Sequence, residues 1–189
     1  MIQTPFINEF YSLFPAPNAE EIISTIEYVC KTKEIDNEYF AWGKRCKVDK
    51  IPLKWENFID LYKPSIDVLS RKFNKKINYT IYNPWLNLYK RDHYQEVHDH
   101  VGHDLSCIFF VNDGVDFGRL FFIGRYSCSC SLKYQEFISY KDNIEPIVKS
   151  GDIMFFSSHL LHGVSTHNSD IVRKTLSVNF NINQVENYE

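Results

Sequence analysis

The segment HYQEVHDHVGHDLSCIFFV, residues 93–111, holds four of the seven histidines in the chain and then turns apolar. Its last seven residues, LSCIFFV, have the length and composition of a short buried strand. His98 and His100 are separated by a single residue, so in an extended chain their side chains project to the same side. The segment therefore predicts a β-protein in which imidazoles gather at the start of a buried strand.

Several similar apolar or alternating runs surround this segment, separated by Gly, Asp and Asn. The predicted strands are residues 77–83, 85–90, 105–112, 119–124, 134–140, 152–157 and 173–182. Six to eight short strands at this spacing are typical of a jelly-roll sandwich or barrel. The β-rich part of the chain is expected to span about residues 77–183.

The N-terminal part shows helical spacing instead. Apolar residues recur every three to four positions over residues 18–33, and a second such pattern runs from Trp55 to Phe73. Pro64 interrupts the second pattern and is expected to kink or divide that helix. We therefore expect a single domain over residues 1–189, mainly β, with helical support over about residues 1–75.

Composition narrows the classes of function. The chain has 189 residues, with 21 basic and 24 acidic side chains and a formal net charge of −3. This balance disfavours nucleic acid as a partner, because backbone binding needs a concentrated positive charge. No apolar run is long enough to span a bilayer, and the N-terminus lacks the charged-then-apolar order of a signal peptide. We expect a soluble cytoplasmic protein without a membrane partner; its oligomeric state stays open.

Two predicted strands each carry a polar face. Alternation places Arg173, Thr175 and Ser177 on one face of the last strand, opposite its apolar residues. In the strand 85–90, alternation likewise groups Asn87 and Tyr89 with the neighbouring tryptophan. Two faces of this kind are what the wall of a ligand pocket requires.

His98 and His100 can share a metal ion only if a third ligand arrives from elsewhere. The candidates along the chain are His103, His159, His162 and His167. His162 lies just beyond the buried strand that follows Gly151, where a short loop returns the chain. Two histidines from one strand and one from another would form a facial metal site with open positions.

Four stretches together resemble the Fe(II)/2-oxoglutarate-dependent oxygenases. They are Tyr89-x-x-Asp92 followed by His98-x-His100, the apolar LSCIFFVND, the segment GDIMFFSSHLLHGV, and the strand RKTLSVNFNI. The resemblance is to the prolyl-hydroxylase-like branch and to uncharacterised phage and bacterial members near it. It covers about residues 77–183 and implies a double-stranded β-helix, a barrel related to jelly rolls and cupins.

The resemblance also implies roles for individual residues. His98 and His162 correspond to the first and distal iron ligands, and Arg173 to the residue that binds the far carboxylate of 2-oxoglutarate. Ser177 is similar to the hydroxyl that assists this arginine, and Tyr89 to an aromatic hydroxyl near the cosubstrate. Asn87 and Thr175 are further candidate cosubstrate contacts, since each shares a face with one of these residues.

Two positions depart from the family pattern. Where most relatives have a carboxylate ligand, this chain has His100, so three histidines would hold the metal unless Asp99 or Asp104 takes that place. In an extended chain, Asp99 points to the other side. Phe110 stands where some relatives have a tyrosine on the cosubstrate carboxylate, so Arg173 would need another donor beside it.

The activity implied by the resemblance is hydroxylation that uses Fe(II), 2-oxoglutarate and O2 and releases succinate and CO2. The substrate, a small molecule or a protein side chain, is not identified by the sequence. Two alternatives remain: a cupin-like metal dioxygenase that does not use 2-oxoglutarate, and a non-catalytic jelly-roll module that binds metal. Arg173 favours the 2-oxoglutarate-dependent hydroxylase over the cupin-like enzyme, because a cupin has no use for a buried arginine one strand beyond its last ligand.

Overall fold

The computed structural model describes residues 9–32, 48–52, 58–124, 131–137 and 143–187. In chain order the elements are β1 (Tyr11–Pro15), α1 (Ala19–Thr32), β2 (Asp49–Pro52), α2 (Phe58–Phe73), β3 (Lys75–Tyr89), β4 (Gln95–His98), β5 (Leu105–Phe110), β6 (Leu120–Ile123), α3 (Leu132–Phe137), β7 (Asn143–Ile144), β8 (Asp152–Ser157), β9 (Leu161–Val164) and β10 (Arg173–Asn187). None of the helices among these residues is long and apolar enough to cross a membrane.

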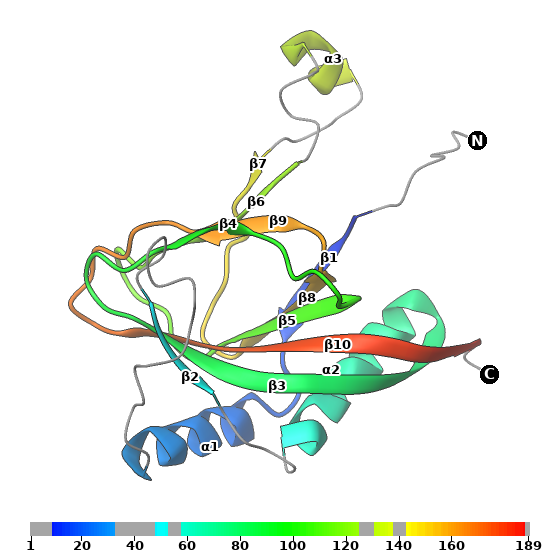
Figure 1. The fold of residues 1–189 in the computed structure, drawn as a ribbon, viewed down its shortest axis with the longest axis horizontal. Helices are drawn as coiled ribbons and strands as arrows, with labels where there is room; N and C mark the ends of the chain where they lie inside the picture. Colours follow the sequence, from blue (N-terminus) through cyan, green and yellow to red (C-terminus); the bar gives the residue numbers. More distant parts are fainter. Residues whose placement is uncertain (1–8, 33–47, 53–57, 125–130, 138–142, 188–189) are drawn as a thin grey trace.

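The strands form two antiparallel sheets that face each other (Figure 1). The major sheet has the order β1-β8-β5-β10-β3-β2, and the minor sheet has the order β4-β9-β6-β7. From β3 onward, successive strands alternate between the two sheets, except where α3 separates β6 from β7. This alternation winds the chain into a double-stranded β-helix, which confirms the predicted fold.

The outer face of the major sheet is covered by α1 and α2 (Figure 1). Ile22 and Ile26 of α1 are almost completely buried there, as the helical spacing of residues 18–33 predicts. They join Leu176 and Phe180, which lie on the apolar face of β10. Burial of these side chains is the main favourable contribution to folding at this face, at about 1.5–3 kcal/mol each. The opposite, polar face of β10 is thereby turned toward the minor sheet.

The second predicted helix is continuous rather than divided. Pro64 lies inside α2, which runs from Phe58 to Phe73 as one helix. Proline removes one backbone hydrogen bond, but the buried face formed by Tyr62 and Leu69 continues across it. Packing against the sheet therefore outweighs the local defect. Trp55, where the helical pattern begins in the sequence, lies outside the described residues.

Three other predictions of secondary structure need correction. The N-terminal part is not only helical, because β1 and β2 form the two edges of the major sheet. The two strands predicted at 77–83 and 85–90 are one continuous strand, β3, which ends at Tyr89. The predicted strand at 134–140 is instead helix α3 as far as Phe137, and residues 138–140 lie outside the described part of the chain. Phe137 is 84% exposed, so the alternation there did not mark a buried face.

Candidate metal centre

Three histidines meet at one end of the space between the sheets. His98 of β4 and His162 of β9 are direct partners across the antiparallel pair, so their side chains lie on the same face of the minor sheet. His100 follows β4, and its backbone N–H donates to the Ser158 carbonyl at 2.8 Å. The ring centroids lie 4.3 Å apart for His98 and His162 and 5.1 Å apart for His100 and His162. One ring nitrogen from each histidine lies within 4.8 Å of the others.

Backbone carbonyls fix the orientation of two of these rings. Nδ1 of His98 lies 2.8 Å from the Glu96 carbonyl, and Nδ1 of His162 lies 2.8 Å from the Leu160 carbonyl. A carbonyl can only accept, so Nδ1 carries the hydrogen and Nε2 carries the lone pair in both rings. Metal-binding histidines are commonly held in this way by a hydrogen bond to the other nitrogen.

Burial keeps the three imidazoles neutral. It lowers the pKa of His98, and it lowers that of His162 well below the ordinary value, with further lowering from the neighbouring histidines. Burial, followed by the nearby His98, lowers the pKa of His100 to about 3. Neutral imidazole is the form that binds metals. The cluster is thus ready to coordinate a cation without first losing protons at neutral pH.

A β-bulge brings Gln95 to the same side as His98. In the pairing of β4 with β9, Gln95 lies opposite Val164 and His98 lies opposite His162, so three steps on β4 match two on β9. Residues three apart normally point to opposite faces, and the extra residue reverses this. Gly163 lies across from the bulge, where an added Cβ would come within 3.0 Å of the Gln95 carbonyl oxygen.

The other candidate ligands have different surroundings. His167 is completely buried, with one ring nitrogen accepting from the Gly118 N–H and the other donating to the Ile171 carbonyl. His103 contacts the Asn181 side chain, and the half-exposed His159 lies 3.7 Å from a carboxylate oxygen of Glu9. None of these three joins the cluster. Each has a structural or surface environment instead.

Neither aspartate takes the place of His100 in the cluster. Asp104 accepts a hydrogen bond from the Ile182 backbone N–H at 2.7 Å, which ties its carboxylate to the backbone of β10. Asp99 is close enough to raise the pKa of His98 slightly against the effect of burial, but the close group contains only histidines. The geometry therefore favours His100 over Asp99.

Arg173 is buried at the start of β10, next to Tyr89 on β3. Its guanidinium carbon lies 4.8 Å from the Tyr89 ring centroid and 5.8 Å from that of Phe110. Burial lowers the pKa of Arg173, and the neighbouring Tyr89 hydroxyl partly opposes this. Nη1 has no hydrogen-bond partner. A buried cation with an unsatisfied donor is costly, so this position calls for an anion.

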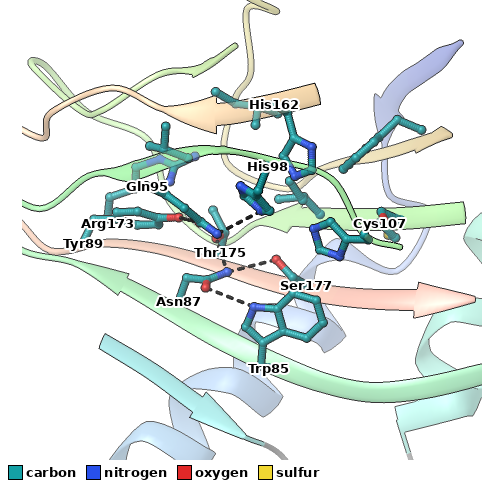
Figure 2. Close-up of a pocket in the computed structure, with 16 residues that line it drawn as sticks. Trp85, Asn87, Tyr89, Gln95, His98, Cys107, His162, Arg173, Thr175 and Ser177 are labelled. Atoms are coloured by element: carbon teal, nitrogen blue, oxygen red, sulfur yellow. Dashed lines mark hydrogen bonds between the residues drawn. The ribbon is translucent and has the colours of Figure 1, made fainter. Parts of the chain in front are cut away.

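Asn87 connects the polar side chains along the wall of the pocket (Figure 2). Its Nδ2 donates to Thr175 Oγ1 at 3.2 Å and to Ser177 Oγ at 2.9 Å, and its Oδ1 accepts from Trp85 Nε1 at 3.1 Å. Ser177 was expected to assist Arg173, but its partner here is Asn87. Because both hydroxyls accept from Asn87, each keeps its own hydrogen to donate into the pocket.

These groups line one pocket between the sheets, with about 400 Å³ not filled by protein atoms, part of it open to solvent. The lining residues are Trp85, Asn87, Tyr89, Gln95, His98, His100, Ser106, Cys107, Ile108, Leu120, Phe156, His162, Val164, Arg173, Thr175 and Ser177. No carboxylate is among these described residues. The three histidines, the buried arginine and the predicted polar wall thus share one cavity.

Sequence reasoning missed Gln95. Strand alternation places it on the face opposite to His98, and only the bulge reverses that assignment. The glycine that follows His162 was a possible signal, because a residue without a side chain in a strand often marks a bulge or a close backbone approach.

A double-stranded β-helix with a histidine cluster and a buried arginine in one cavity defines the class of Fe(II)/2-oxoglutarate oxygenases. A family model described as "Putative 2OG-Fe(II) oxygenase" matches residues 83–181, which is more than half of the chain. The chain belongs to this 2-oxoglutarate/Fe(II) oxygenase family, whose members use iron, 2-oxoglutarate and O2. No curated protein matches it significantly.

Solved structures agree on the fold. An oxidoreductase of the 2OG-Fe(II) oxygenase family from Burkholderia pseudomallei has a TM-score of 0.66 at 12% identity, covering 95% of this chain and 87% of its own. The α-ketoglutarate-dependent carbocyclase SnoK from nogalamycin biosynthesis has a TM-score of 0.65 at 15% identity, covering 95% and 82%. HygX from Streptomyces hygroscopicus, solved with nickel and 2-oxoglutarate, has a TM-score of 0.60 at 10% identity, covering 90% and 82%.

Proposed function

We propose that this protein is a hydroxylase that couples the oxidative decarboxylation of 2-oxoglutarate to oxidation of a second substrate. One O2 is consumed: one oxygen atom enters succinate and the other enters the hydroxylated product, and CO2 is released. The observation that carries the proposal is the buried guanidinium of Arg173, whose Nη1 has no hydrogen-bond partner, in the same cavity as three neutral imidazoles. An anion with a metal-chelating end matches both requirements.

His98, His100 and His162 would hold the ferrous ion through one ring nitrogen each, Nε2 in the case of His98 and His162. Three ligands on one side leave the remaining positions for cosubstrate and O2. When bound, iron supplies the oxygen-activating chemistry. The protein contributes the fixed orientation of the rings, through the carbonyls that hold Nδ1 of His98 and His162.

Arg173 would bind the far carboxylate of 2-oxoglutarate through paired hydrogen bonds. Tyr89 packs against the guanidinium, which holds the fork in place. Thr175 and Ser177 can donate their hydroxyl hydrogens to the same ligand, while Asn87 keeps both hydroxyls oriented. Five residues of the predicted set would thus surround one elongated anion.

Replacement of the usual carboxylate ligand by His100 changes the charge of the site. A ferrous ion held by three neutral imidazoles carries one more positive charge than one held by two imidazoles and a carboxylate. Because the interaction between charges is strong in a buried site, this excess favours a dianionic cosubstrate. Binding of 2-oxoglutarate would bring the charge of the metal and its ligands close to zero.

Anaerobic binding followed by turnover tests the proposal. The iron-loaded protein should bind 2-oxoglutarate and, on admission of air, release succinate, with a faster rate when a true substrate is present. His162→Ala should lose bound iron and succinate release together, whereas His159→Ala, which alters a histidine outside the cluster, should keep both.

Two results would overturn it. Iron content that is equal in wild type and His162→Ala would indicate a module without this metal site. Iron binding with no affinity for 2-oxoglutarate would instead indicate a cupin-like enzyme. A screen of small metabolites and of peptide side chains, read out as substrate-stimulated succinate release, would then identify the substrate class, for which we expect no nucleic acid.

A further inference from the structure

Gln95 is the middle member of a hydrogen-bonded chain that runs from Tyr89, beside Arg173, to His98 of the metal cluster (Figure 2). Arg173 lies against Tyr89, with its guanidinium carbon 4.8 Å from the ring centroid. The Tyr89 hydroxyl donates to Gln95 Oε1 at 2.7 Å, and Gln95 Nε2 lies 3.1 Å from His98 Nε2. Gln95 is itself buried, at 8% exposure. The chain therefore joins the two ends of the pocket through side chains alone.

The direction of both bonds in this chain is set from the His98 end. His98 already donates from Nδ1 to a carbonyl, so its Nε2 must accept. The Gln95 amide therefore has its NH2 toward the metal cluster and its oxygen toward Tyr89, and that oxygen accepts from the Tyr89 hydroxyl.

A metal ion would take away the hydrogen-bond acceptor of this NH2 group. His98 Nε2 has a single lone pair, which can accept from Gln95 or bind a metal but cannot do both. Once a metal takes the lone pair, the Gln95 N–H loses its acceptor while its oxygen stays held by Tyr89. A buried donor without an acceptor is unfavourable. An oxygen atom bound to the metal next to His98 would satisfy it.

We propose that Gln95 binds the metal-side carboxylate of 2-oxoglutarate by donating from Nε2. This inference rests on the proposed function and adds a cosubstrate-binding residue at the end of the ligand opposite to Arg173. It also implies that the metal binds before 2-oxoglutarate. In the metal-free protein the Gln95 amide is hydrogen-bonded to His98 and is not available to the cosubstrate. The bulge in β4 is what delivers this side chain to the cavity.

Two variants and one control test the proposal. Gln95→Glu keeps an oxygen for Tyr89 but replaces the donor with a negatively charged oxygen, and Gln95→Leu removes donor and acceptor. Gln184→Glu makes the same chemical change on the exposed end of β10. Affinities for Mn2+ alone, and for 2-oxoglutarate at saturating Mn2+, would be measured by calorimetry, so that no turnover is needed.

We expect both Gln95 variants to bind 2-oxoglutarate about tenfold to a hundredfold more weakly, the range for loss of a hydrogen bond to a charged group. Mn2+ affinity should stay unchanged or increase, because the competing bond to His98 is gone. The Gln184 variant should match the wild type in both measurements.

The opposite pattern would overturn the assignment. Weaker Mn2+ binding with intact affinity for 2-oxoglutarate would mean that Gln95 only orients His98. Equal cosubstrate affinity in wild type and both Gln95 variants would also exclude it. If the wild type itself fails to bind 2-oxoglutarate, the proposed function is wrong, a result that differs from either of these.

Discussion

Replacing Arg173 with methionine should leave the stability of the ligand-free protein nearly unchanged while abolishing its response to 2-oxoglutarate. The guanidinium is buried with Nη1 unsatisfied, and such a donor costs about 1–3 kcal/mol. The substitution also removes cation–π contacts with Tyr89 and Phe110, worth about 0.5–2 kcal/mol each. A methionine thioether recovers about 0.3–1.5 kcal/mol against such rings. These contributions nearly cancel, so the net change in the free energy of unfolding is expected to stay within about 1 kcal/mol.

Cosubstrate binding should change far more than stability. A paired arginine–carboxylate contact contains two charge-assisted hydrogen bonds, each worth about 1.5–3 kcal/mol, so its loss should weaken 2-oxoglutarate by at least two orders of magnitude. Urea unfolding of the Mn2+-loaded protein, with and without 2-oxoglutarate, measures both effects. Ligand at a hundred times its Kd should stabilise the wild type by about 2.7 kcal/mol, and the variant by almost nothing.

Lys174→Met is the matched control, because Lys174 is the next residue of β10 and alternation turns it to the opposite face. It should leave the ligand-induced stabilisation intact. The reasoning fails if Arg173→Met keeps that stabilisation, or if the variant loses more than about 2 kcal/mol without ligand. Either result would show that the guanidinium serves the fold rather than the cosubstrate.

Three further predictions concern the metal cluster and its supporting strands. His100→Ala should lose bound iron in metal analysis while Asp99→Ala keeps it, and the reverse would restore a carboxylate ligand. The metal-free protein should lose stability in acid: burial lowers the pKa of His100 to about 3, so stability is fully present above the ordinary value of 6.5 and falls as pH decreases toward the folded pKa. At about pH 5.5 this histidine alone costs about 1.4 kcal/mol, so His100→Gln should reduce the acid loss seen in urea unfolding by that amount, and an unchanged loss would count against its burial. Gly163→Ala should cost about 1–3 kcal/mol and weaken Mn2+ binding, because its Cβ would lie 2.8 Å from Cζ of Phe121 and 3.0 Å from the Gln95 carbonyl oxygen; wild-type stability and metal affinity in that variant would show that the bulge tolerates a side chain.

The polar face of β10 could be predicted because its alternation is strict. Arg173, Thr175 and Ser177 lie on the pocket side, and Leu176 and Phe180 lie in the core beneath the helices. The period of two in a strand translates directly into two faces. The histidine cluster could be predicted for a similar reason, since His98 and His162 each adjoin a recognisable apolar strand.

Features that depend on an extra residue in a strand could not be predicted in this way. The bulge in β4 turns Gln95 into the cavity, and another irregularity in β3 falls near Pro84, between Tyr82 and Trp85. Each shifts the alternation by one residue, and neither changes the apolar pattern. The prediction for the segment that contains Phe137 failed for a different reason. Its sequence alternates, but none of the described strands pairs with it, and Leu132–Phe137 form helix α3 instead.

The two ends of the pocket belong to different sheets. His98 and His162 stand on the minor sheet, whereas Arg173 and Tyr89 stand on the major sheet. A dicarboxylate held at both ends would therefore tie one layer of the sandwich to the other, and the spacing between the layers would select its chain length. Diacids one methylene shorter or longer than 2-oxoglutarate should be rejected for this reason, even though they offer the same charges.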